Sequence, residues 1–417
     1  MIGRLISIIF IYACTTVAWF ILGGTVVMRS EKQDGKLRGA VGKLWGTEHR
    51  QKAPTIWYET KREVENKRVE GDKVIRELRT QTTTHPVSLD SSKIKVDLAL
   101  EHRRKGLLWY ATYKVRFAAR YTVTNTTDEP REFFVKFPFP TDGAVYDNFQ
   151  FTLGGRKVTN VTVQDGAVRE SLKLGVGEVG VVEVAYDSQG LDQWWYDFGS
   201  DVSQVKDFVL TMNTDFDKID FPQNSISPTD KKQVGKGWQL EWKYTNLLTG
   251  VKIGMEMPKK LNPGPWVSEV TFFAPVSLFL FFFLLFVLTT IRGIKVHPMN
   301  YFFLGAAFFS FHLLMAYLVD HLDIHAAFAV AAATSVFLVV SYMRLVVGAR
   351  VAFVEIALSQ LVYLVLFSYA FFFEGYTGLT ITVLCVATLF VVMQFTGRTD
   401  WSALFRKTGE PLPPVIQ

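Results

Sequence analysis

The sequence predicts a membrane protein with a six-helix α-helical transmembrane bundle and a large β-rich domain. One N-terminal anchor helix precedes the domain and five helices follow it. Of the 417 residues, 49% are hydrophobic and 35 are phenylalanine, which is typical of a chain that lies largely in lipid. The apolar residues are concentrated at 5–28 and from 267 almost to the end, whereas residues 30–266 have the composition of a soluble domain.

The first apolar segment is predicted to be a retained anchor. Residues 5–28 carry no charge and are long enough to cross a bilayer. A cleavable signal peptide has a shorter apolar core, about 7–15 residues, followed by a small-x-small cleavage site, and this segment has neither. The predicted domain order is an anchor at 1–29, a β-rich domain at 30–266, a five-helix bundle at 267–397 and a tail at 398–417.

Loop charge predicts the orientation of the helices. The five later spans are expected at Val267–Ile291, Tyr301–Val319, Ala326–Met343, Val351–Phe373 and Gly378–Phe395. Short loops on one side contain arginine or lysine, while the alternate loops, 320–325 and 374–377, contain none. The positive-inside rule then places both termini, including the tail at 398–417, in the cytoplasm and residues 30–266 on the outer side of the membrane. The basic residues of the cytoplasmic side are Arg4, Arg292, Lys295, Arg344, Arg350, Arg398, Arg406 and Lys407.

The middle of the chain alternates with period two, which predicts strands with one buried face. In "YKVRFAARYTV" (113–123), apolar residues take every second position and Lys114, Arg116 and Arg120 lie on the other face. Turn-forming residues separate these runs, so an antiparallel β-sandwich or a pair of smaller sheets is expected. Further strands are predicted at 131–139, 145–153, 157–163, 178–186, 206–213, 238–244 and 251–257.

Residues 59–80 are rich in Glu, Lys and Arg, which favour a helix, yet their valines form no helical stripe. Glu70-Gly71-Asp72 reads as a turn in the middle of the segment. A charged hairpin is the preferred interpretation, and a helix is the alternative.

The stretch "DHLDIH" (320–325) has the residue types of a metal site. His321 and His325 stand at the i,i+4 spacing that places two imidazoles on one helical face, but the chain must reverse here between two spans. A helix-capping turn is therefore preferred over a metal site or a proton relay, and no metal or other cofactor is predicted. Asp320 and His321 are predicted to contact the β-rich domain or another envelope protein.

Polar side chains inside the predicted spans are costly and often functional. His312, Gln360 and Ser335 come out near the midplane, and they are expected to form a buried polar link. Glu355 lies nearer the cytoplasmic end, where Arg344 or Arg350 is the expected partner. A transport site built on this cluster is the alternative.

Signatures of catalysis are missing. The sequence has no G-x-S-x-G elbow, no P-loop, no H-E-x-x-H and no cysteine pair, since Cys14 and Cys385 both lie in apolar spans. The net charge of +6 forms no basic patch, so nucleic-acid binding is not expected. A membrane-bound hydrolase or transferase would need carboxylates or histidines converging at the membrane surface.

Several motifs resemble the CreD family of bacterial inner-membrane proteins. They include "KVHPMNYFFLG" (295–305), "VDHLDIHAAF" (319–328), "FEGYTGL" (373–379) and "TGRTDW" (396–401) in the helical part. In the soluble part they include "LWGTEHRQKAP" (44–54) and "EHRRKGLLWYATY" (101–113). The resemblance implies a protein of the bacterial inner membrane linked with cell-envelope integrity or envelope stress response, with residues 30–266 in the periplasm. Because catalytic signatures are missing, a non-catalytic role is expected. The expected partners are membrane lipids and an envelope protein that contacts the periplasmic domain.

Overall fold

The computed structural model describes residues 2–70, 73–199, 203–373 and 375–397. These residues form two compact units, a helical unit within 1–35 and 261–417 and a β-rich unit at 36–260. The predicted cytoplasmic tail, 398–417, lies outside the described residues.

Six helices in the described part of the chain are long and apolar enough to cross a membrane, which confirms the predicted number of apolar helices. α1 continues past the predicted end of the anchor, because the residues after Met28 are strong helix formers such as Glu31, Lys32 and Leu37. The long helices are α1 (Ile2–Trp45), α2 (Pro263–Ile291), α3 (Pro298–Leu318), α4 (Ile324–Val347), a fifth helix at 349–372 and α8 (Thr377–Thr396).

The fifth helix changes its winding repeatedly. Two stretches have the wider i→i+5 turns of a π-helix, and the last turn is the tighter 3₁₀ form. Its segments are α5 (Ala349–Val351), η1 (Ala352–Ile356), α6 (Ala357–Gln360), η2 (Leu361–Leu366), α7 (Phe367–Tyr369) and η3 (Ala370–Phe372). The sequence gives no sign of this, because π-turns have no distinctive residue pattern.

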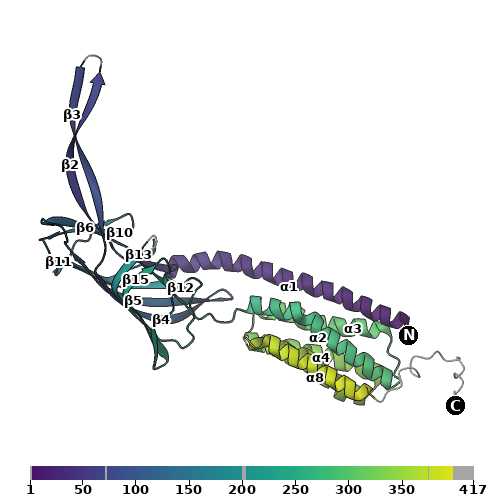
Figure 1. The fold of residues 1–417 in the computed structure, drawn as a ribbon. Helices are drawn as coiled ribbons and strands as arrows, with labels where there is room; N and C mark the ends of the chain where they lie inside the picture. The colour runs from purple at the N-terminus through teal and green to yellow at the C-terminus, as the bar shows by residue number, and fades with distance from the viewer. Residues whose placement is uncertain (1, 71–72, 200–202, 374, 398–417) are drawn as a thin grey trace, which may run out of the picture. The chain divides into compact units, whose positions relative to one another are not determined.

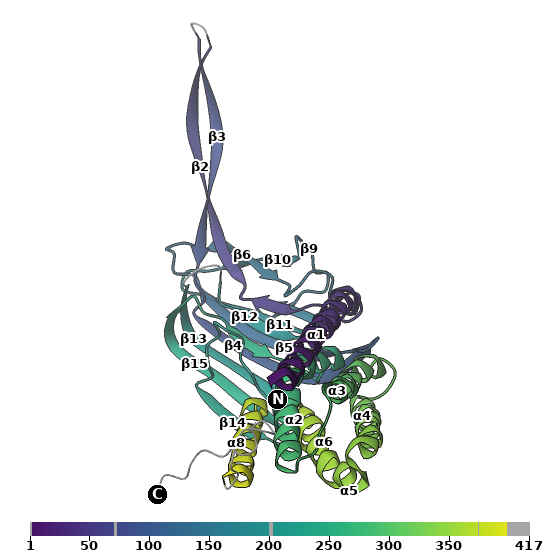
Figure 2. The same ribbon diagram turned by 90° about the vertical axis from the view of Figure 1, so that its right-hand side faces the viewer.

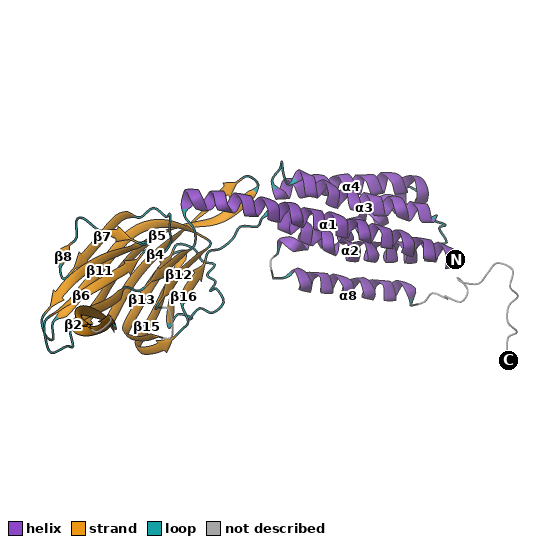
Figure 3. Cartoon of the chain, turned by 90° about the horizontal axis from the view of Figure 1, so that it is seen from above, coloured by secondary structure: helices purple, strands orange, loops and turns teal. Residues whose placement is uncertain are grey.

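The β-rich unit contains three sheets (Figures 2 and 3). The large sheet has the order β14-β15-β13-β4-β5-β11-β7-β8, the second β3-β2-β6-β10-β9 and the small one β1-β12-β16. The strands of the large sheet are β4 (Ser91–Lys105), β5 (Leu108–Thr124), β7 (Asp147–Leu153), β8 (Arg156–Lys157), β11 (Val179–Leu191), β13 (Ser203–Thr214), β14 (Asp230–Val234) and β15 (Gly237–Thr249). The others are β1 (His49–Lys52), β2 (Thr55–Glu70), β3 (Lys73–Val87), β6 (Arg131–Pro138), β9 (Val163–Gln164), β10 (Ala167–Leu174), β12 (Gln193–Asp197) and β16 (Ile253–Glu256).

One hydrophobic core joins the three sheets. Phe117 of β5, Phe137 of β6 and Trp194 of β12 are all fully buried in it, so the sheets pack face to face as predicted for a sandwich. The purely antiparallel arrangement is wrong, because β1 pairs with β12 and β4 with β13 in parallel. These pairings join strands far apart in the sequence, and local alternation cannot reveal them.

The predicted charged hairpin at 59–80 is confirmed, and the helix alternative is wrong. β2 and β3 pair antiparallel from Ile56↔Val87 to Glu70↔Lys73, and the resulting ribbon projects from the sheets of this unit (Figure 1). The turn residues 71–72 lie outside the described part. The predicted strand at 157–163 is wrong, since only its two ends lie in strands, β8 and β9.

Candidate functional site

Asp320 binds the first helix. Its carboxylate forms an ion pair with Arg29 of α1 at 3.2 Å, and Arg29 Nη2 also donates to the Ala316 carbonyl oxygen at 2.6 Å. The guanidinium lies over the Tyr317 ring, 5.5 Å from its centre. A single arginine thus holds the end of α3 against α1 by charge, hydrogen bonding and ring contact.

The stretch around Asp320 is a helix-capping turn. Asp323 is the N-cap of α4, because its carboxylate accepts a hydrogen bond from the His325 amide at 3.0 Å. The ring of His325 stacks on Phe372, and His321 is exposed. Chain reversal separates the two imidazoles, and the described residues contain no group of three or more metal-ligating side chains.

Glu355 pairs with Arg292, at 2.6 Å, instead of with Arg344 or Arg350 as expected. The expectation was wrong because it used depth along the fifth helix alone. Glu355 lies in the π-turn η1 and Arg292 caps the C-terminal end of α2, and sequence spacing does not show which faces of the two helices meet.

The predicted polar link exists in part. Gln360 Nε2 donates to Ser335 Oγ at 3.0 Å, and that hydroxyl donates to the Ala307 carbonyl oxygen at 2.7 Å, which ties the fifth helix to α4 and α3. His312 is not a member. Its Nδ1 lies 3.1 Å from the carbonyl oxygen of Phe308 in its own helix, and its ring packs edge-on against Trp19 of α1.

Replacing Ser335 with Ala is expected to destabilise the helical unit by about 1 kcal/mol, since buried Gln360 loses its acceptor. A double-mutant cycle with Gln360→Leu should give a coupling energy of similar size, measured by detergent-induced unfolding. Thr334→Ala is the matched control, because the Thr334 hydroxyl bonds only within its own helix. A double-mutant cycle that pairs Ser335→Ala with His312→Leu should give no coupling energy. A coupling energy in that cycle would contradict the conclusion that His312 lies outside the polar link.

The motif "HPMNY" organises the start of α3. His297 is the N-cap and accepts from the Met299 amide, and Pro298 takes the first helical position. Asn300 accepts a 2.7 Å hydrogen bond from Tyr342 of α4, and the Tyr301 hydroxyl meets Arg4 of α1. The motif therefore joins three helices at one end of the unit.

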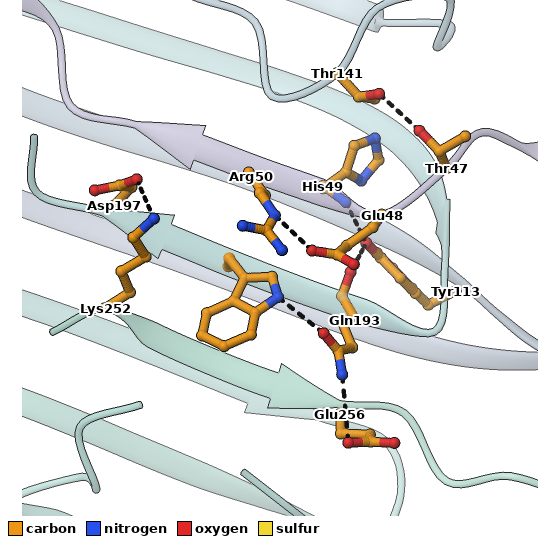
Figure 4. A network of polar contacts seen from close by, with 11 residues as sticks. Thr47, Glu48, His49, Arg50, Tyr113, Thr141, Gln193, Asp197, Lys252 and Glu256 are labelled. Carbon is orange, nitrogen blue, oxygen red and sulfur yellow. Dashed lines mark hydrogen bonds and ion pairs between the residues drawn. The ribbon is translucent and has the colours of Figure 1, made fainter. Parts of the chain in front are cut away.

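A second polar cluster is buried in the β-rich unit, where β1 brings His49 between the sheets (Figure 4). The His49 amide donates to the Tyr113 hydroxyl at 3.3 Å, and that hydroxyl donates to the Gln193 carbonyl oxygen at 2.8 Å. His49 Nε2 lies 3.3 Å from Ser188 Oγ. Two residues further along β1, Gln51 accepts a 2.7 Å hydrogen bond from the Tyr186 hydroxyl.

The Ser188–His49 pair does not have the geometry of an activated nucleophile. The single proton of Ser188 is donated to the Val145 carbonyl oxygen at 2.8 Å, so its oxygen accepts from His49 Nε2–H. His49 Nδ1 then carries a buried lone pair that no described residue contacts by hydrogen bond. Burial lowers the pKa of His49 to about 4, so the ring is neutral at neutral pH.

The outward face of the large sheet carries two broad hollows, of about 610 and 640 Å³. In the first hollow, small residues leave space on the sheet surface, because Ala118 and Ala185 stand opposite each other on β5 and β11. Charged side chains rise around them, and the Arg116 side chain, at 72% exposure, forms an ion pair with Asp187 at 3.1 Å. Sequence alternation predicts this outward face, but only the pairing of β4, β5, β11 and β13 assembles it.

The two hollows differ in charge. One is lined by three basic side chains and one acidic, namely Lys93, Lys95, Arg120 and Glu183. The other is lined by two basic and four acidic side chains, namely Lys114, Arg116, Asp97, Asp147, Asp187 and Asp215. The face is therefore bipolar, and it is more complementary to a partner surface of mixed charge than to a uniformly charged polymer.

Comparison with known proteins supports the resemblance seen in the motifs. A search of curated proteins found no match. Among solved structures, the chain is similar to a Legionella pneumophila protein provisionally described as a nutrient binding protein. That likeness has 10% identity and a TM-score of 0.31, covers 46% of this chain and 73% of the other, and is too weak to indicate a ligand. Residues 212–402 match the family model described as inner membrane protein CreD, so the predicted CreD resemblance is confirmed over that region.

Proposed function

We propose that this chain is a non-catalytic inner-membrane protein of cell-envelope maintenance, whose β-rich unit lies in the periplasm and binds a protein partner. Six membrane-capable helices and the match to an inner membrane protein family support the membrane location. Loop charge supports the periplasmic side for the residues between the first and second helices.

The observation that carries the binding role is the bipolar outward face of the large sheet. Its charged side chains are accessible to a partner, since the Arg120 side chain is 58% exposed and the Lys114 side chain 60%. Packing within the unit does not require hollows on a polar face of this kind. Opposite charges in separate hollows orient a partner and raise its association rate more than they raise affinity. Ser188, which lines one hollow, is bound to His49 and Val145 and offers no reactive hydroxyl.

The test is photo-crosslinking in living cells, with a benzoyl-phenylalanine in place of Gln150 or Thr211 beside the hollows. A reproducible protein adduct is expected from these positions. No adduct is expected from Val163, which is exposed on β9 of the second sheet. Cysteine in place of Lys157 should react with a membrane-impermeant maleimide in spheroplasts, and protection there would contradict the periplasmic location.

A charge swap separates recognition from stability. Arg116→Asp combined with Asp187→Arg keeps a local ion pair but reverses its direction on the face, so thermal stability should change by less than about 1 kcal/mol. The adduct and resistance to envelope stress should both fall. An unchanged adduct in the swapped protein would exclude the hollows as the binding surface.

A further inference from the structure

We infer that a groove between α4 and the fifth helix binds one anionic phospholipid, with the acyl chain in the groove and the phosphate on Arg344. The groove has a volume of about 620 Å³. Apart from Ser341 and Arg344, the side chains that line it are apolar. An apolar groove with a cationic side chain at its end is complementary to an amphipathic anion.

The rim and floor of the groove differ in size. Phe337 of α4 and Phe353 of the fifth helix are 70% and 58% exposed and stand as its rims. Ala332 and Ala357 line the interior, where their small side chains leave room. The groove is thus open to the side, where lipid surrounds a membrane helix, and is not a channel through the unit.

The length of the groove matches one leaflet. From Ala332 to Arg344 the helix α4 rises about 18 Å at 1.5 Å per residue. Half of a hydrocarbon core about 30 Å thick is about 15 Å. Arg344 therefore comes at headgroup level when the far end of the groove is at the midplane.

The π-turns keep the second wall straight. The lining residues of the fifth helix are four apart, at Phe353, Ala357, Leu361 and Val365. In a regular α-helix such positions drift by about 40° at each step. The i→i+5 turns of η1 and η2 put more residues in each turn, so the four positions stay on one face. Wide turns of this kind recur at functional sites.

Arg344 is available to the phosphate. The nearby carboxylate of Glu355 is engaged by Arg292 at 2.6 Å, and no described carboxylate forms an ion pair with Arg344. Loop charge places this end of α4 at the cytoplasmic leaflet, whose anionic lipids attract arginine.

The test uses the purified full-length protein and native mass spectrometry with palmitoyl-oleoyl phosphatidylglycerol and the matching phosphatidylcholine. One phosphatidylglycerol should be retained in preference to phosphatidylcholine, and Arg344→Gln should weaken that retention about tenfold. Arg350→Gln, which removes a neighbouring exposed arginine outside the groove, should change it less than about twofold. Ala357→Phe should reduce retention of both lipids by filling the groove.

Two outcomes would overturn the inference. Equal phosphatidylglycerol retention by the wild type and Arg344→Gln would show that Arg344 does not bind the phosphate. A dimer that Ala357→Phe dissociates, with lipid retention unchanged, would assign the groove to a helix of a second copy.

Discussion

Acidification is expected to destabilise the β-rich unit through His49. The pKa of His49 is about 4 in the folded protein, because burial penalises the charged ring, and 6.5 in an unfolded chain. Because the folded state favours the neutral ring, the β-rich unit keeps its full stability with respect to His49 above pH 6.5. The unfolded chain binds the proton first, and about 3 kcal/mol is lost as the pH falls from 6.5 to 4.

The measurement is urea unfolding of the full-length protein in detergent, followed by tryptophan fluorescence at pH values from 7.5 to 4.5. His49→Gln should flatten the part of the pH dependence that lies between 6.5 and 4. His321→Gln, at an exposed histidine, is the matched control and should leave the profile unchanged. The same slope in His49→Gln and the wild type would show that other groups cause the acid sensitivity.

Replacing Gly190 with Ala is expected to cost about 3 kcal/mol in the unfolding of the same unit. Gly190 lies opposite Tyr113 in the pairing of β11 with β5, and the Tyr113 side chain crosses the space above it. A methyl group there would collide with the Tyr113 hydroxyl and would lie 2.8 Å from His49 Nδ1. Hydrogen bonds hold the Tyr113 hydroxyl to the His49 amide and the Gln193 carbonyl oxygen, and the His49 ring to Ser188, so neither side chain can move away cheaply.

Gly39→Ala provides the control for this substitution. A methyl group at Gly39 meets no atom within 4 Å, and alanine favours the helix there, so stability should rise slightly. The urea midpoint of Gly190→Ala should fall at an unchanged slope. A urea midpoint equal to that of the wild type would contradict the prediction. It would mean that β5 and β11 can move apart enough to accommodate the methyl group beside His49 and Tyr113.

Local patterns were sufficient for much of this protein. Apolar runs give all six helices, because a bilayer requires about 20 apolar residues whatever the neighbouring helices are. Period-two alternation in β5 predicts that Phe117 and Tyr121 are buried, as they are. β4 was missed even though Ile94, Val96 and Leu98 alternate in the same way, since charged residues surround them.

Candidate sites were harder to predict, because they depend on partners distant in the chain. The contact between Ser335 and Gln360 follows from equal depth in neighbouring helices, and sequence spacing found it. The Arg29–Asp320 and Glu355–Arg292 pairs depend on helix rotation, which sequence spacing alone leaves open. The burial of His49 has no local signal, since His49 belongs to a four-residue strand whose paired neighbour, β12, lies more than a hundred residues away.

The sequence by itself determined the number of apolar helices, the charge of their loops and the β-rich nature of residues 30–266, because these depend on composition and short periods. Only the tertiary structure decided which charges pair, where a histidine is buried and that a groove ends at Arg344. These features arise from strand pairing and helix rotation. Both are set by packing between distant segments, and no local period encodes them.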